Sequence, residues 1–179
     1  MKKSTMRMIM SLLVTLIVTC TASYGQSDMK ITYTPEEGVV LKSTNPLEGM
    51  DTTQLVALLG APTQARDFIS GEKSFYYDEA GLVFMTTGGQ VQGVGITFNH
   101  DGDDKFSATP FTGQLHLGDI SVDRETTPED LTGSGKVEII CPIPIMCASK
   151  DRTAPVKVMA GYSEEGALTQ MILLFPQEG

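Results

Sequence analysis

Side chains able to do chemistry are few in this sequence, and none stands in a spacing that defines a catalytic centre. The two histidines are His100, in a polar segment, and His116, in a strand-like segment. Two histidines four residues apart on a helix would indicate a zinc peptidase, and a nucleophile elbow would indicate a serine hydrolase, but both patterns are absent. We therefore predict no catalytic residue, no cofactor and no metal ligand.

The polar segment 99–105 begins like a calcium-binding loop, with oxygen-bearing side chains at alternate positions from Asn99 to Asp103. Position six of such a loop is glycine and position twelve is glutamate, whereas this chain has Asp104 and Pro110 there. We interpret the segment as a solvated linker, with an irregular calcium site as the alternative.

Two cysteines, Cys141 and Cys147, remain after the N-terminal segment is set aside. An exported chain with an even number of cysteines permits a disulfide between them, closing a short hairpin-like loop. The alternative is two free thiols that behave as small buried hydrophobes. Two thiols with no histidine nearby do not make a structural zinc site, which needs about four ligands.

Three consecutive aromatic residues, Phe75, Tyr76 and Tyr77, lie in a strand-like segment. Side chains alternate between the two faces of a strand, so Tyr76 points away from the face that Phe75 and Tyr77 share. Either these residues form an exposed aromatic binding surface, or the second half of the chain covers it.

Residues 1–25 have the order of a secretory signal peptide: basic residues, an apolar run from Met8 to Val18, then small residues. The run is too short to span a membrane. Lipid anchoring through Cys20 is the alternative, although Thr19 is larger than the residue normally found there. The mature chain would carry ten Lys plus Arg against twenty-two Asp plus Glu, a net charge of −12. That charge disfavours nucleic acid as a partner.

The elements that must position these residues are one clear helix and several strands. Residues 52–59 predict a short helix that begins at Asp51 or Thr52 and ends at Gly60 and Pro62. Strands are predicted around 73–77, 82–85 and 91–98, with glycines in the turns between them. Gly93 and Gly95 leave one face of the last strand without side chains, which indicates a bulge or a close approach of another segment.

The order of these features recurs after the polar segment at offsets of 74 to 77 residues. Gly38 corresponds to Gly113, Thr52-Thr53 to Thr126-Thr127, and Gly89 to Gly166. We interpret this as an old duplication, with a first helix-plus-sheet repeat at 26–105 and a second, degenerate repeat at 106–179. The expected fold class is α+β, each unit being a short helix packed on an antiparallel meander.

The chain also resembles an uncharacterised family of exported bacterial proteins. The resemblance is carried by four structural motifs: Thr52-Thr53-x-Leu55, Leu58-Leu59-Gly60-x-Pro62, Tyr76-Tyr77-Asp78-Glu79-x-Gly81-Leu82 and Phe111-x-Gly113-x-Leu115. More distantly, the tandem unit is similar to the β-lactamase inhibitor protein fold. This resemblance implies a fold and no activity.

Together these observations predict an exported, non-enzymatic binding or interaction protein of the bacterial envelope, periplasmic or secreted. Its partner would be a protein or a small ligand. Two alternatives remain open: a hydrolase with an unrecognised site that uses a carboxylate or His116, and a structural component of an envelope complex.

Overall fold

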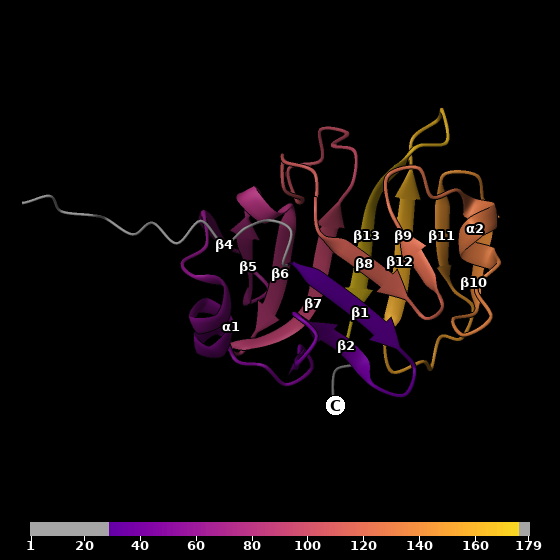
Figure 1. Cartoon of the computed structure of the whole chain (residues 1–179). Helices are drawn as coiled ribbons and strands as arrows, with labels where there is room; N and C mark the ends of the chain where they lie inside the picture. The colour runs from indigo at the N-terminus through magenta and orange to yellow at the C-terminus, as the bar shows by residue number, and fades with distance from the viewer. Residues whose placement is uncertain (1–28, 176–179) are drawn as a thin grey trace, which may run out of the picture.

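The computed structural model describes residues 29–175, which form two β-sheets packed face to face (Figure 1). The smaller sheet has the strand order β3-β2-β1-β8-β9. Its strands are β1 (Lys30–Thr34), β2 (Gly38–Leu41), β3 (Asn45–Pro46), β8 (Gln114–Leu117) and β9 (Ile120–Val122). The predicted signal peptide and the alternative anchor at Cys20 lie outside the described residues.

The larger sheet has the strand order β10-β11-β12-β13-β7-β6-β5-β4, with every neighbouring pair antiparallel. Its strands are β4 (Gln64–Asp67), β5 (Glu72–Tyr77), β6 (Leu82–Thr87), β7 (Gln90–Thr97), β10 (Ile139–Ile143), β11 (Met146–Ser149), β12 (Lys157–Tyr162) and β13 (Leu168–Leu174). A 3-10 turn, η2 (Asp78–Ala80), joins β5 to β6.

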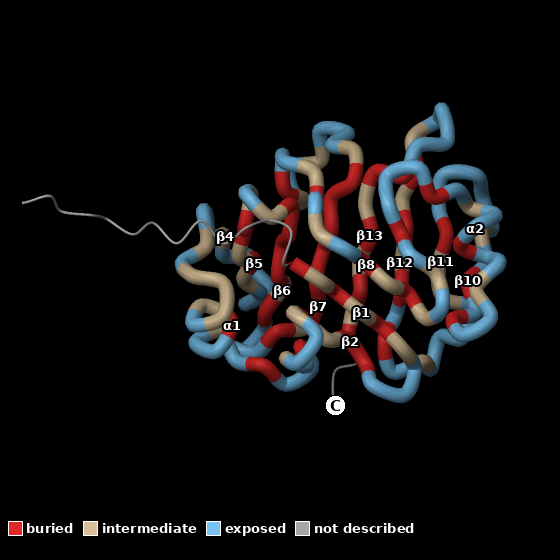
Figure 2. The backbone as a smooth tube through the Cα atoms, viewed as in Figure 1, coloured by how far each residue is buried: buried red, intermediate tan, exposed pale blue. Residues whose placement is uncertain are grey.

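The hydrophobic core lies between the two sheets. The smaller sheet contributes alternate residues of its strands, such as Ile31 and Leu115, which are register partners on β1 and β8. The larger sheet contributes Phe84, Val94 and Leu173, which follow one another across β6, β7 and β13. Figure 2 shows this buried seam running through the middle of the molecule. Burying each large apolar side chain contributes about 1.5–3 kcal/mol.

The two helices lie at opposite ends of the larger sheet (Figure 1). The helix α1 (Thr52–Leu59) begins as predicted, because Asp51 and Gln54 form a capping box, and its only buried residue is Leu55. The helix α2 (Pro128–Thr132) is capped by Thr127 in the same way and buries only Leu131. Neither helix buries enough apolar surface to cover a sheet of eight strands.

The expected α+β fold of two helix-plus-meander units is therefore wrong. The face of the meander that we assigned to a helix is covered by the five-stranded sheet instead, and the β-lactamase inhibitor protein-like fold is not found. The reason is a long-range pairing: β1 pairs in parallel with β8, so that Ile31 faces Leu115. The first strands of both halves thus leave their meanders and build a sheet of their own, and no finding supports tandem repeats. The boundary between 26–105 and 106–179 stays a prediction.

Candidate functional site

The three consecutive aromatic residues do not form an exposed surface. Tyr77 points into the core, where its ring meets the ring of Phe84 edge-on at 5.6 Å between centroids. Its hydroxyl donates a hydrogen bond to the carbonyl oxygen of Gly60 at 3.2 Å, and burial raises its pKa to about 12. Phe75 is half-buried against the same core. Tyr76 points to the opposite face, yet only 2% of it is exposed.

The cover over Tyr76 comes from β4 and from the loop that follows β7. The guanidinium carbon of Arg66 lies 4.9 Å from the centre of the Tyr76 ring, a cation–π contact. Arg66 also donates to the carbonyl oxygen of Asp104 at 2.8 Å and pairs with the carboxylate of that residue at 3.3 Å. The polar segment that resembled a calcium loop therefore serves to cover part of the sheet.

We call the face of the larger sheet that points away from the five-stranded sheet the outer face. Gly95 lies on it, and a Cβ atom there would come within 3.1 Å of the Phe106 ring. The missing side chain therefore makes room for Phe106, a close approach of the kind that the two glycines predicted. At this end the chain covers its own outer face.

A disulfide joins Cys141 and Cys147, whose Cα atoms lie 4.0 Å apart across the β10–β11 hairpin. Cys147 is fully buried, so the bond fixes the hairpin onto the core. The tip of the hairpin exposes apolar side chains, among them Ile143 and Met146.

The histidines do not assemble a recognisable catalytic centre. His116 lies on the smaller sheet, where its Nδ1 atom is 3.1 Å from the hydroxyl oxygen of Ser121. His100 lies in the segment 99–105 and is exposed. Among residues 29–175, no group of three or more His, Cys, Asp or Glu side chains could hold a metal ion.

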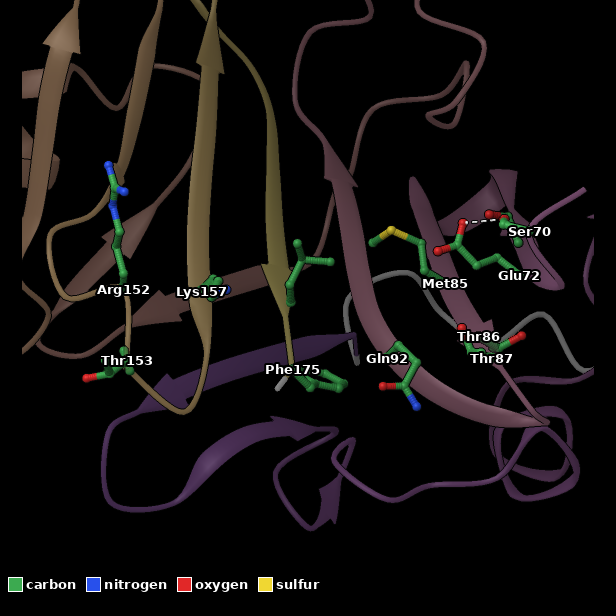
Figure 3. A pocket seen from close by; sticks show the side chains of 13 residues that line it. Ser70, Glu72, Met85, Thr86, Thr87, Gln92, Arg152, Thr153, Lys157 and Phe175 are labelled. Carbon is green, nitrogen blue, oxygen red and sulfur yellow. Dashed lines mark hydrogen bonds between the residues drawn. The ribbon is translucent and has the colours of Figure 1, made fainter. Parts of the chain in front are cut away.

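The part of the outer face that the chain leaves open contains a cavity of ≈ 740 Å³, which we call the outer-face groove. This volume lies within the range of small-molecule sites. The groove is lined by Ser70, Glu72, Ser74, Met85, Thr86, Thr87, Gln92, Arg152, Thr153, Ala154, Lys157, Leu174 and Phe175. Figure 3 looks onto it, with Arg152 and Lys157 on one side and Ser70 and Glu72 on the other.

The floor of the groove is one row of cross-strand neighbours. Lys157 on β12 faces Leu174 on β13, which faces Gly93 on β7, which faces Met85 on β6. The next residue in the row is Ser74 on β5. The row thus has a positive charge at the Lys157 end, followed by the apolar residues Leu174, Gly93 and Met85.

The two basic side chains of the groove are exposed. Neither Arg152 nor Lys157 forms an ion pair with another described residue. Glu72, on the opposite side, accepts a hydrogen bond from the Ser70 hydroxyl at 3.1 Å. In a chain with an excess of acidic residues, this groove is locally basic at one end.

A second cavity, of ≈ 610 Å³, lies beside α2 and is lined by four acidic residues, among them Asp123 and Asp130. Both carboxylates already accept hydrogen bonds from neighbouring backbone amides: Asp130 from Thr127 and Asp123 from Glu125. We therefore take the outer-face groove as the candidate site.

Sequence reasoning missed this site because its residues lie far apart along the chain. Met85 and Leu174 are 89 positions apart and become neighbours only through the strand order β6-β7-β13. The sequence did contain one indication of the site, the glycines Gly93 and Gly95. They mark the strand that side chains of other segments approach closely.

Comparison with known protein families identifies a family for this chain, but that family has no known function. A family model described as a domain of unknown function (DUF7738) matches residues 30–132, a range that ends with α2. No curated protein matches the chain. Arg152, Lys157 and Leu174 lie beyond the matched range.

Two solved structures show weak likenesses to this chain. An extracellular protein containing a SCP domain from Bacillus anthracis is 11% identical, with 72% of this chain and 44% of that chain covered and a TM-score of 0.46. A cysteine-rich secretory protein from Staphylococcus aureus is 12% identical, with 72% and 43% covered and a TM-score of 0.38. This chain spans less than half the length of either protein, and likenesses of this size carry no argument. In the described part of the chain, no helix has the length and apolarity needed to cross a membrane.

Proposed function

Since the chain belongs to the DUF7738 family, which is described only as a domain of unknown function, we propose a function from the groove itself. The protein is an exported, non-enzymatic binding protein of the bacterial envelope, and its ligand binds in the outer-face groove. The observation that carries this proposal is the open groove beside a part of the same face that the chain covers with its own loop.

Export is supported by two independent features. The N-terminal segment has the order of a signal peptide. The disulfide between Cys141 and Cys147 is a bond that persists in oxidising compartments outside the cytosol.

Binding is favoured over catalysis by the side chains that line the groove. No histidine and no cysteine is among them, and Glu72 is their only carboxylate. Glu72 is held by Ser70, and Lys157, the other lining side chain that could transfer a proton, lies on the opposite side of the groove, so the two do not form an acid–base pair (Figure 3). Cations beside an apolar floor are, in contrast, a common arrangement for fixing the orientation of a bound ligand.

The experiment is a thermal-stability screen of the mature chain, residues 26–179. Its compounds come from separate classes: sugars, nucleotides, amino acids, acyl anions and short peptides. A ligand that binds only the folded state raises the unfolding temperature. We expect one class to do so, and we expect the double variant Arg152→Gln with Lys157→Gln to lose the response.

The matched control is Lys136→Gln with Lys150→Gln, which removes two exposed positive charges outside the groove. It should keep the response of the native chain. No response to any class, or an equal response in both double variants, would refute binding in the groove.

One observation favours a second candidate, a hydrolase. The Ser121 hydroxyl lies within hydrogen-bond distance of His116 Nδ1, as a nucleophile and its base would. None of the cavities described above contains both residues. Ester hydrolysis by the native chain that disappears in Ser121→Ala would establish this candidate; equal, background rates in both proteins would remove it.

A further inference from the structure

We propose that the ligand of the outer-face groove is a fatty-acid carboxylate, a single acyl chain ending in one anionic group. This inference rests on the proposed binding function and names its ligand class. The carboxylate binds Arg152 and Lys157, and the acyl chain lies across the sheet over Leu174, Gly93 and Met85.

The shape of the floor fits one extended chain. The row from Lys157 to Met85 crosses three strand spacings, from β12 through β13 and β7 to β6. At about 4.8 Å per spacing it measures about 14 Å, which suits a medium-length acyl chain lying perpendicular to the strands. The row itself is one residue wide, so it gives a linear path along which a single acyl chain can lie.

Gly93 keeps this track continuous. A Cβ atom at this position would lie 2.8 Å from Leu174 Cδ2 and 3.1 Å from Met85 Cε. The side chains from the two neighbouring strands therefore close over the glycine and form an unbroken apolar surface. Leu174 and Met85 are only half-buried, so apolar area remains for a ligand to cover. Covering this area removes apolar surface from water and therefore favours binding.

The charges set the orientation of the ligand. Arg152 and Lys157 are two of the ten basic residues of the mature chain, and both line this one groove. Arginine binds a carboxylate with two parallel hydrogen bonds, and lysine adds a second positive charge. Glu72 lines the other side, where it repels an anionic group. The acyl end therefore points toward Met85, and the carboxylate stays at β12.

The same face offers further apolar area beside the track. Ile172 on β13 and Met159 on β12 are cross-strand partners, both half-buried, and point to the outer face. This second row, separate from the row between Lys157 and Met85, continues from Met159 through Ala148 on β11 to the exposed Ile140 on β10. A sugar or a nucleotide could bond to hydroxyl side chains of the lining such as Ser74 and Thr153. It would not cover the apolar surface of Leu174, Met159 and Ile172, because these side chains offer its polar groups no hydrogen-bond partner.

The test is titration calorimetry with four probes: dodecanoate below its micelle concentration, dodecanol below its solubility limit, acetate and inorganic phosphate. We expect saturable binding of dodecanoate by the native chain. Dodecanol, which lacks the charge, should bind at least tenfold more weakly, and acetate and phosphate, which lack the acyl chain, should give no measurable heat.

Two variants locate the ligand. Arg152→Gln with Lys157→Gln should weaken dodecanoate binding at least tenfold, and Met85→Gln, which keeps the volume and adds an amide, should weaken it severalfold. The double variant Lys136→Gln with Lys150→Gln should bind like the native chain. Unfolding temperatures of all variants without ligand serve as the check on folding.

The outcomes separate this inference from the proposed function. Equal dodecanoate affinity in the native chain and in the groove variants would overturn the inference. No dodecanoate binding, together with another class that stabilises the native chain but not the groove variant, would overturn the inference and leave the binding function standing. If no compound class stabilises the native chain and dodecanoate does not bind, both the inference and the proposed binding function are refuted.

Discussion

The ring of Phe106 fills the space above Gly95, where a Cβ atom would lie 3.1 Å from the ring. This contact brings the loop after β7 onto the outer face of the larger sheet, beside Tyr76 and Arg66. One part of that face is thus closed by the chain itself. Two residues earlier on β7, Gly93 lies in the part that remains open.

The variant Phe106→Ala should release this loop. We expect the free energy of unfolding to fall by about 1–3 kcal/mol, since a packed ring is removed and Tyr76 becomes accessible to water. Urea unfolding measures the loss, and hydrogen exchange should rise along β5. Phe68→Ala, at an exposed turn, is the control and should stay within about 0.5 kcal/mol of the native chain. Equal losses in the two variants would contradict the covering role.

The disulfide should contribute modestly to stability. A bond that closes a loop this short, with a sequence separation of 6, removes little entropy from the unfolded chain. We expect Cys141→Ser with Cys147→Ala to lower the free energy of unfolding by roughly 2 kcal/mol. A reducing agent should destabilise the native chain by a similar amount and leave the double variant unchanged. A native chain indifferent to reduction would show that the bond does not form.

The buried phenols should make stability fall at high pH. Burial raises the pKa of Tyr77 and of Tyr162 from 10.0 to about 12 in the folded chain, and nearby Asp130 adds to the shift of Tyr162. The unfolded chain therefore releases these protons first. The contribution to stability is fully present below pH 10 and is lost as the pH rises from 10 to about 12. Ultraviolet titration of tyrosine ionisation, with urea midpoints along the same pH series, measures the effect.

The same two tyrosines give a matched pair of variants at neutral pH. Tyr77→Phe removes a hydroxyl that donates to the Gly60 carbonyl oxygen and should cost about 1 kcal/mol. Tyr162→Phe removes a buried hydroxyl that has no hydrogen-bond partner among the described residues, so it should cost nothing or stabilise the chain. If urea unfolding shows a larger loss in the free energy of unfolding for Tyr162→Phe than for Tyr77→Phe, the Tyr162 hydroxyl, and not the Tyr77 hydroxyl, makes the stabilising hydrogen bond.

Local structure could be predicted from the sequence, because its causes are local. The capping box at Asp51, the helix end at Gly60 and the strands of the β5–β6–β7 meander follow from side-chain chemistry within a few residues. The edge position of β10 likewise follows from Pro142, which has no amide hydrogen to donate.

The second sheet could not be predicted in this way. Nothing near Ile31 indicates that its partner is Leu115, since the parallel pairing of β1 with β8 joins residues that are 84 positions apart in the sequence. Local patterns therefore predict a helix over the uncovered face of the meander, whereas α1 buries only Leu55 and is too small to cover it. The groove was missed for the same reason, because Lys157 and Met85 meet only through the order of four strands.

The central claim is that a ligand binds on the outer face at the row from Lys157 to Met85. The most direct measurement is nuclear magnetic resonance of the isotope-labelled mature chain during a dodecanoate titration. We predict that backbone amide shifts change for Met85, Gly93, Lys157 and Leu174, and that Thr32 and His116 on the smaller sheet do not respond. Shifts confined to the smaller sheet, or spread over α2 with the groove unchanged, would contradict the account.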